Sequence, residues 1–173
     1  MYNTAVGYNA GRLVTTGTLN TLIGGLAGDA LTVAYNNVAL GYNTLSTATI
    51  SSRNTALGTS ALATHNLSSA GNGYNTAIGY DAGYAVTTGS INTLIGGLSG
   101  DALTIGNSNV AVGYDSLTNE VAGDRNVAIG VTALKNQTNA STIDSYNTAV
   151  GYGAGLAVTT GLENTLIGAE AGD

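Results

Sequence analysis

Side chains that could carry acid–base, metal or redox chemistry are scarce in this sequence of 173 residues. It contains a single His (His65), a single Lys (Lys135) and no Cys, and only 8% of its residues are charged, against about 25% in ordinary domains. Without Cys there is no thiol nucleophile, disulfide or Cys-based zinc site. We therefore expect no catalytic residue, no metal and no cofactor, and a protein that is not an enzyme.

Two Arg residues, Arg53 and Arg125, recur at equivalent positions of a repeated sequence, and each precedes an Asn. A guanidinium there could clamp a phosphate or a carboxylate. A structural salt bridge, for example between Arg125 and Asp124, or simple solvation is the interpretation that we favour. His65 lies in an expected loop with no repeated counterpart, so we predict that it is exposed to solvent.

An Asp recurs in a small-Gly-Asp corner at Asp29, Asp101 and Asp173. A repeated carboxylate could suggest calcium. However, no second acidic column accompanies it and no Gly-rich nonapeptide is present, which argues against a metal site.

The elements that must position these residues belong to an internal repeat. A five-residue pattern, Asn-Thr/Val-Ala/Leu-Val/Ile/Leu-Gly, occurs ten times at intervals of 17, 17, 17 and 21, so a four-coil super-repeat covers 2–73, 74–145 and, in part, 146–173. We expect one array over residues 1–173, with no second domain. The Asn column is Asn3, Asn20, Asn37, Asn54, Asn75, Asn92, Asn109, Asn126, Asn147 and Asn164, and the Gly column is Gly7, Gly24, Gly41, Gly58, Gly79, Gly96, Gly113, Gly130, Gly151 and Gly168.

Each column of the pattern predicts one structural role. Residues two apart in a strand share a face, so the residues one and three past each Asn, including Ile95 and Ile129, are predicted to face inward. The Gly suits a corner that needs positive φ or close backbone approach, and the Asn amides are expected to stack along one corner. Apolar residues do not recur with helical spacing. The sequence thus predicts an all-β fold, a parallel β-solenoid of ten coils with a period of 17 or 21.

Two features could contact a ligand. A Tyr follows the corner Gly in alternate coils, at Tyr8, Tyr42, Tyr80, Tyr114 and Tyr152; this row would serve glycan contact or packing, and we favour packing. The fourth coil of each super-repeat carries four extra residues, and its connecting segments, 59–74 and 131–146, differ from each other. We expect them to bulge outward as loops that either bind a ligand or tolerate insertion. Their candidate contact residues are His65, Lys135, Gln137 and Asp144.

The Ala-Ile-Gly at residues 77–79 and 128–130 resembles the head repeat of trimeric autotransporter adhesins, whose coils carry a Ser-Val-Ala-Ile-Gly core. The wording Asn-Thr-Ala-Val-Gly-Tyr also resembles repeats of phage tail fibres. The resemblance implies a left-handed β-roll, three chains packed side by side as a homotrimer, and a role in surface attachment. The period of 17 or 21 is longer than the family's short coil, and Thr takes the place of its Val in seven coils.

These expectations lead to a structural and attachment role, as part of a phage tail fibre or bacterial adhesin located outside the cell, on the cell surface or on the virion. The partners would be further copies of the chain, in a homotrimer or an end-to-end filament, and a cell-surface or glycan ligand. The array starts and stops without polar caps, which is expected either of a fragment of a longer protein or of a chain whose ends stack on other copies in such a filament. The charge of −6 argues against nucleic acid, and no apolar run is long enough for membrane insertion. The alternative is an ice-binding β-solenoid, although Thr does not form a paired outward ladder in successive coils.

Overall fold

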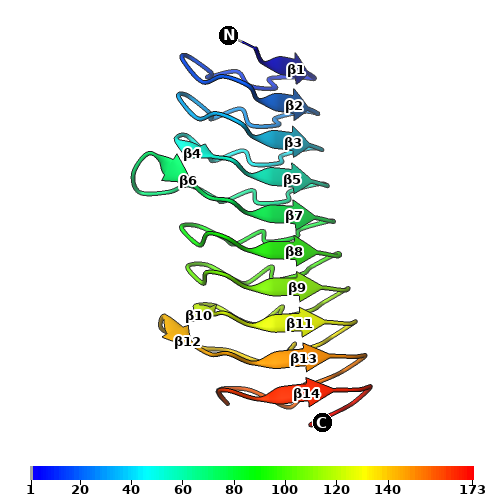
Figure 1. Ribbon diagram of the computed structural model, residues 1–173. Coiled ribbons are helices and arrows are strands. Elements are labelled where there is room, and N and C mark those ends of the chain that lie inside the picture. The colour runs from blue at the N-terminus through cyan, green and yellow to red at the C-terminus, as the bar shows by residue number, and fades with distance from the viewer. Residues whose placement is uncertain (1) are drawn as a thin grey trace.

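The computed structural model describes residues 2–173 as a rod of stacked coils with its two ends far apart (Figure 1). One strand from each coil joins a ten-stranded parallel sheet that runs the length of the rod. Its strands are β1 (Thr4–Val6), β2 (Thr21–Ile23), β3 (Val38–Leu40), β5 (Thr55–Leu57), β7 (Thr76–Ile78), β8 (Thr93–Ile95), β9 (Val110–Val112), β11 (Val127–Ile129), β13 (Thr148–Val150) and β14 (Thr165–Ile167). The predicted all-β solenoid is therefore confirmed. Within this range no helix is long and apolar enough to cross a membrane.

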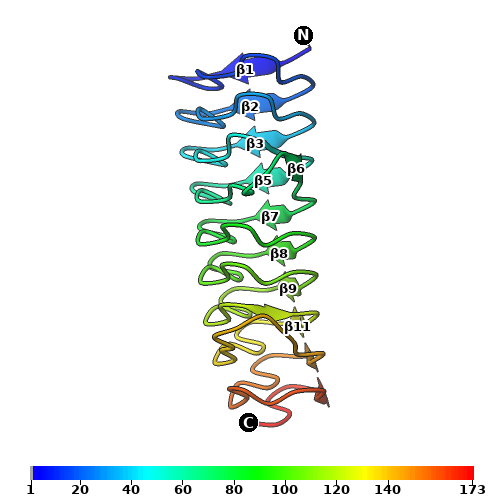
Figure 2. The same cartoon turned by 90° about the vertical axis from the view of Figure 1, so that its left-hand side faces the viewer.

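The longer fourth coils keep the register of the sheet. Thr55 pairs with Thr76 across a longer coil just as Thr4 pairs with Thr21 across a shorter one. The extra residues leave the sheet and form two small parallel pairs, β4 (Ser51–Ser52) with β6 (Gly71–Asn72), and β10 (Gly123–Asp124) with β12 (Ile143–Asp144). Figure 1 shows the segments around β6 and β12 projecting beyond the regular coils, and Figure 2 shows the same stack of coils from that side. The predicted outward loops are therefore confined to these parts of segments 59–74 and 131–146, whose earlier residues include the buried Leu62 and Leu134.

The predicted strand register was wrong. In the long sheet, the middle residue of the strands from β2 to β13 is fully buried, whereas the flanking residues face outward; Ile129, predicted to face inward, is 38% exposed, and Ile95 is only partly covered. A coil this short leaves room between its walls for Ala or Leu, while β-branched residues suit the exposed pleat of a sheet. The buried middle residues are Leu22, Ala39, Ala56, Ala77, Leu94, Ala111, Ala128 and Ala149.

Side-chain volume is matched across the narrow core. Leu22 fills the space that Gly11 and Gly28 leave, since a Cβ on these glycines would lie 2.7 and 2.8 Å from its two Cδ atoms. Where the strand offers only Ala, in β3 and β5, the equivalent of those glycines is a buried Leu, namely Leu45 and Leu62. The coils of β1, β7 and β13 have Ala in the strand and Gly at this position, and there a Leu of a neighbouring coil fills the space, as Leu94 does at Gly83, where an added Cβ would lie 2.7 Å from its Cδ1. Large and small side chains thus alternate across the core so that the coils pack closely.

The corner glycines meet both predicted requirements. Their φ angles lie between 126° and 143°, a region that other residues rarely adopt. From Gly7 to Gly151, an added Cβ would also lie within 2.6 Å of the carbonyl oxygen of the corner Gly in the next coil. Any side chain at this corner would push adjacent coils apart.

The Asn side chains form the expected ladder inside the opposite corner. In a typical step, the backbone N–H and the Nδ2 of Asn37 both donate to Oδ1 of Asn20, at 3.0 and 3.2 Å, and Nδ2 also donates to the carbonyl oxygen of Ser51. The ladder is buried from Asn20 to Asn147. It satisfies polar groups that would otherwise be costly inside the rod and ties each coil to its neighbour.

Candidate functional site

The outward side of the long sheet is a strip without charge. Its two columns hold only Thr, Val, Ile and Leu, and side chains such as Val38 (37%) and Leu40 (41%) are exposed on it. We call this strip the flat face. Its residues are Thr4, Val6, Thr21, Ile23, Val38, Leu40, Thr55, Leu57, Thr76, Ile78, Thr93, Ile95, Val110, Val112, Val127, Ile129, Thr148, Val150, Thr165 and Ile167.

The tyrosine row follows the corner glycines beside the flat face. Its five rings are between 55% and 78% exposed, so they remain accessible for contact. Two of the rings pack against a glycine in the preceding coil. A Cβ on Gly25 would lie 3.3 Å from the ring of Tyr42, and one on Gly97 would lie 3.5 Å from the ring of Tyr114. The alternation of Tyr with small residues along this column thus has a packing reason.

The structure overturns the predicted exposure of His65 and also removes Gln137 from the surface. Both side chains are fully buried. They occupy equivalent positions within the two segments 59–74 and 131–146, which we call the first and second inserts. Gln137 Oε1 accepts a hydrogen bond from Nδ2 of the ladder residue Asn147 at 2.9 Å. His65 Nε2 lies 3.5 Å from Nδ2 of Asn75. They support the ladder and cannot touch a ligand.

The buried imidazole carries an electrostatic consequence. Burial lowers the pKa of His65 to about 4, with the Thr87 backbone opposing this weakly, because a charged ring would lose its hydration. Its Nδ1 has no hydrogen-bond partner of good geometry. The first insert therefore holds a neutral histidine with one unsatisfied nitrogen.

A buried carboxylate organises the second insert, and sequence reasoning missed it. Glu120 is fully buried, and its two oxygens accept six hydrogen bonds at 2.7 to 3.1 Å. The donors are the backbone N–H groups of Val121, Ala122, Gly123 and Asn139 and the side-chain amides of Gln137 and Asn139. The signal was present in the comparison of the copies, since Glu120, Gln137 and Asn139 together replace Ala48, His65 and Leu67.

The two charged contact candidates of the second insert are held in ion pairs. Lys135 Nζ lies 2.5 Å from Oδ2 of Asp115, and this contact raises the pKa of Lys135. Asp144 is the ion-pair partner of Arg125, not the predicted Asp124.

Asp124 has a separate structural role. Its Oδ1 accepts a hydrogen bond from the backbone N–H of Asn107 at 2.6 Å. This bond fastens β10 to the preceding coil, so the carboxylate next to Arg125 in the sequence is already occupied.

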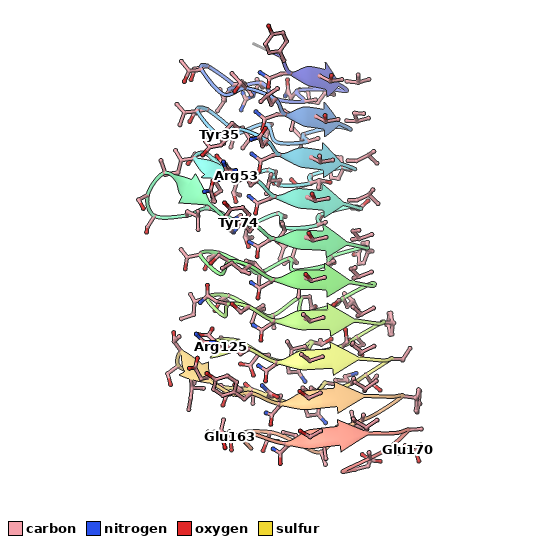
Figure 3. The ribbon with its side chains drawn as sticks, in the orientation of Figure 1. Tyr35, Arg53, Tyr74, Arg125, Glu163 and Glu170 are labelled. Carbon is pink, nitrogen blue, oxygen red and sulfur yellow. The ribbon has the colours of Figure 1, made fainter. Side chains whose placement is uncertain are left out.

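Arg53 in the first super-repeat has a different environment. Its guanidinium lies over two rings, with Cζ 5.3 Å from the centroid of Tyr35 and 5.6 Å from that of Tyr74, and Figure 3 shows it between them. Arg53 Nη1 donates to Tyr74 Oη at 2.8 Å, and Asn72 connects the two phenols by accepting from Tyr35 Oη and donating to Tyr74 Oη, each at 3.3 Å. We call Tyr35, Arg53, Asn72 and Tyr74 the arginine cluster.

The recurring Asp corner does not assemble a metal site in residues 2–173, where no three His, Cys, Asp or Glu side chains converge. Asp29 lies 4.0 Å from Arg12. Burial, followed by the charge of Asp115, raises the pKa of Asp101, whose Oδ1 has no hydrogen-bond partner.

The chain matches no protein-family model, no curated protein and no solved structure.

Proposed function

We propose that this chain is a structural segment of a fibrous surface protein, without catalysis, that associates with further copies of itself through the flat face. The observation that carries the proposal is the uninterrupted, uncharged face of ten strands. Contiguous apolar surface of this kind is typical of interaction sites. A homotrimer on the cell surface or virion, as in the adhesins and tail fibres that the repeat resembles, is the assembly that we favour.

The dimensions of the face are consistent with such a contact. Ten strands spaced by ~4.8 Å, each three residues and so about 10 Å long at ~3.3 Å per residue, give about 480 Å². A stable interface needs about 800 Å² from each partner. The tyrosine row, which adjoins the strip, supplies the remaining area with side chains that suit a partly wet interface.

Solution mass with matched variants tests the proposal. We expect the wild type to sediment as an oligomer at micromolar concentration. Replacing Ile78, Ile95 and Val112 together by Lys places three charges on adjacent strands of the flat face and should yield a monomer that stays folded, because these side chains point outward. The control places three Lys at the exposed positions Thr88, Asn119 and Ser141, which lie outside the flat face and the tyrosine row, and should remain oligomeric. A monomeric wild type would overturn the proposal, whatever the variants do.

The outward orientation of the Thr column favours a second candidate, an ice-binding solenoid. Seven of the ten strands present Thr on the flat face, beside an aliphatic column in every coil. Regular, weakly charged and Thr-rich faces are what such a function uses. Thermal hysteresis measured on a monomeric sample tests this candidate directly, and its absence there would exclude it.

A further inference from the structure

Arg53 is a cation without an acidic partner. The chain has four Lys and Arg residues, all within the described range 2–173, and the other three, Arg12, Arg125 and Lys135, each lie within 4.0 Å of an Asp. The surroundings add little negative charge: residues 2–73 contain two Arg and one Asp, a net charge of +1, whereas residues 74–145 contain six acids and two bases, a net charge of −4. The first super-repeat is therefore the part of the chain that can attract an anion.

The arginine cluster presents hydrogen-bond donors to solvent. A guanidinium has five N–H groups, and the structure uses one of them, toward Tyr74. Tyr74 Oη accepts from both Arg53 and Asn72, so its own O–H remains free to donate. Arg53 and Tyr74 are both exposed, and the rings of Tyr35 and Tyr74 hold the guanidinium in place by cation–π contact.

The second super-repeat shows which group fits such donors. There the equivalents of Arg53 and Tyr74 are Arg125 and Tyr146, and Asp144 stands where the first copy has Asn72. The Asp144 carboxylate pairs with Arg125 and accepts a hydrogen bond from Tyr146 Oη at 3.2 Å. The chain thus supplies its own carboxylate to the second cluster and none to the first.

We propose that the arginine cluster binds a carboxylate of an acidic saccharide, in the manner in which the second super-repeat binds Asp144. Arg pairs with carboxylates through parallel N–H groups. Ser68 and Ser69, in the same insert as Asn72 and Tyr74, are exposed, so their hydroxyl groups are available to a polyhydroxylated ligand. The cluster is an open surface, so one sugar binds weakly. A polymer with repeated carboxylates binds with a higher apparent affinity, because it offers many equivalent groups to the same cluster. The site lies at the amino-terminal side of the strands (Figure 3) and does not depend on the flat face or on self-association.

An oligogalacturonate titration of the full chain, followed by calorimetry, tests the assignment. The loss of one charge-assisted contact should weaken binding about tenfold or more, so R53Q is expected to do so. N72D is the sharper variant: it keeps Arg53 but supplies an internal carboxylate, and should weaken binding to the same extent. D144N should create a second, weaker site, weaker because Asn107 stands in the place of Tyr35. Circular dichroism melting and sedimentation, both expected to be unchanged, separate these effects from unfolding and from the flat-face contact.

Three outcomes would overturn the proposal. The methyl-esterified oligomer could bind as well as the acid, which would show that the carboxylate is not recognised. N72D could bind like the wild type, which would remove the arginine cluster from the site. Polyglutamate could bind as tightly as oligogalacturonate, which would make the ligand a peptide carboxylate and not a saccharide.

Discussion

The two inserts occupy the same longer coil in successive super-repeats and solve the same packing problem with different residues. Each must place a hydrogen-bonding side chain against the Asn ladder, and the first uses His65 where the second uses Gln137. A Cβ on Gly73 would lie 2.2 Å from Asn54 Oδ1 and 2.6 Å from His65 Nε2, whereas the equivalent Ser145 has room for a side chain, whose Oγ accepts a hydrogen bond from Asn139 Nδ2 at 3.1 Å. The comparison shows that the buried residues of an insert differ as a group between the two copies, because the size of each buried side chain limits the volume available to its neighbours.

The inserts differ more deeply in how completely their polar groups are satisfied. In the second, Glu120 accepts six hydrogen bonds and Asp144 is paired with Arg125. In the first, His65 Nδ1 lacks a partner and Arg53 lacks an acid. The polar groups of the second insert are satisfied within the chain, as buried polar groups usually are. In the first insert the donors that remain open to a ligand are those of the exposed Arg53, because His65 is buried.

The largest expected effect on the free energy of unfolding comes from the buried residues of the long sheet, to which both longer coils contribute a strand. Ala56→Asp in β5 and Ala128→Asp in β11 would each bury an unpaired carboxylate, and should lower the free energy of unfolding by several kcal/mol or prevent folding. Leu57→Asp and Ile129→Asp, one position further, face outward and should cost less than about 1 kcal/mol. Urea unfolding monitored by circular dichroism measures the four changes. Equal effects of neighbouring substitutions would contradict the inward placement of the Ala residues.

Next comes the closed network of the second insert. Glu120→Ala would leave two side-chain amides and four backbone N–H groups without their acceptor, and should cost about 3–5 kcal/mol. A quadruple variant gives these positions the residues of the first super-repeat: Glu120→Ala, Gln137→His, Asn139→Leu and Ser145→Gly. It should recover much of the lost stability, because Ala, His, Leu and Gly already pack together at the equivalent positions. A quadruple variant less stable than the single one would show that the inserts are not interchangeable.

His65, which the second insert replaces by Gln137, should make the free energy of unfolding depend on pH. The pKa of His65 falls from its ordinary 6.5 to about 4 on folding, so its neutral form stabilises the fold above pH 6.5 and this contribution is lost as the pH drops from 6.5 through 4. The loss should reach about 2 kcal/mol by pH 5. His65→Gln copies Gln137 and should remove this part of the dependence. The difference in unfolding free energy between the variant and the wild type, measured from pH 7 to pH 5, checks the sign; an unchanging difference would contradict it.

The smallest effect sharpens the contrast between the two arginines. Tyr35→Asn makes the arginine cluster resemble the second copy, where the equivalent residue is Asn107, and removes one cation–π contact worth about 0.5–1 kcal/mol. Asn107→Tyr should give a similar gain on the Arg125 side. Thermal melting of both variants, expected to shift in opposite directions, provides the measurement; shifts of the same sign would indicate that the ring acts through something other than the guanidinium.

The repeat period was enough to predict the stacked parallel strands, the Asn ladder and the corner Gly, because each of these depends on one residue type recurring in every coil. The facing of the strands could not be read from hydrophobicity, since the exposed Ile and Val are more apolar than the buried Ala. Volume carried the missing signal. Leu22 stands in the coil whose later position is Gly28, while Ala39 stands with Leu45, and this exchange of size marks the two columns as partners in the core.

The candidate site was predicted only in part. The sequence singled out Arg53 and the inserts, but it could not show that Tyr35, from the preceding coil, and Tyr74, from the following one, enclose the guanidinium. It also placed His65 and Gln137 on the surface because polar loop residues usually lie there. Their burial follows from the ladder, whose amides need partners in a coil that the extra residues have widened.

The constant register of the long sheet turns the period of the super-repeat into a length. Each strand pairs with the next in the same alignment in the shorter and in the longer coils, so four coils advance the rod by about 19 Å at ~4.8 Å per coil. Arg53 and Arg125 therefore lie one such step apart along a single line, and an insert can change its side chains without shifting the line. The rod therefore carries one arginine site in each complete super-repeat at a fixed spacing, and the residues of one site can change without affecting the other. Adding or removing a super-repeat would change the number of these sites but not the distance between them.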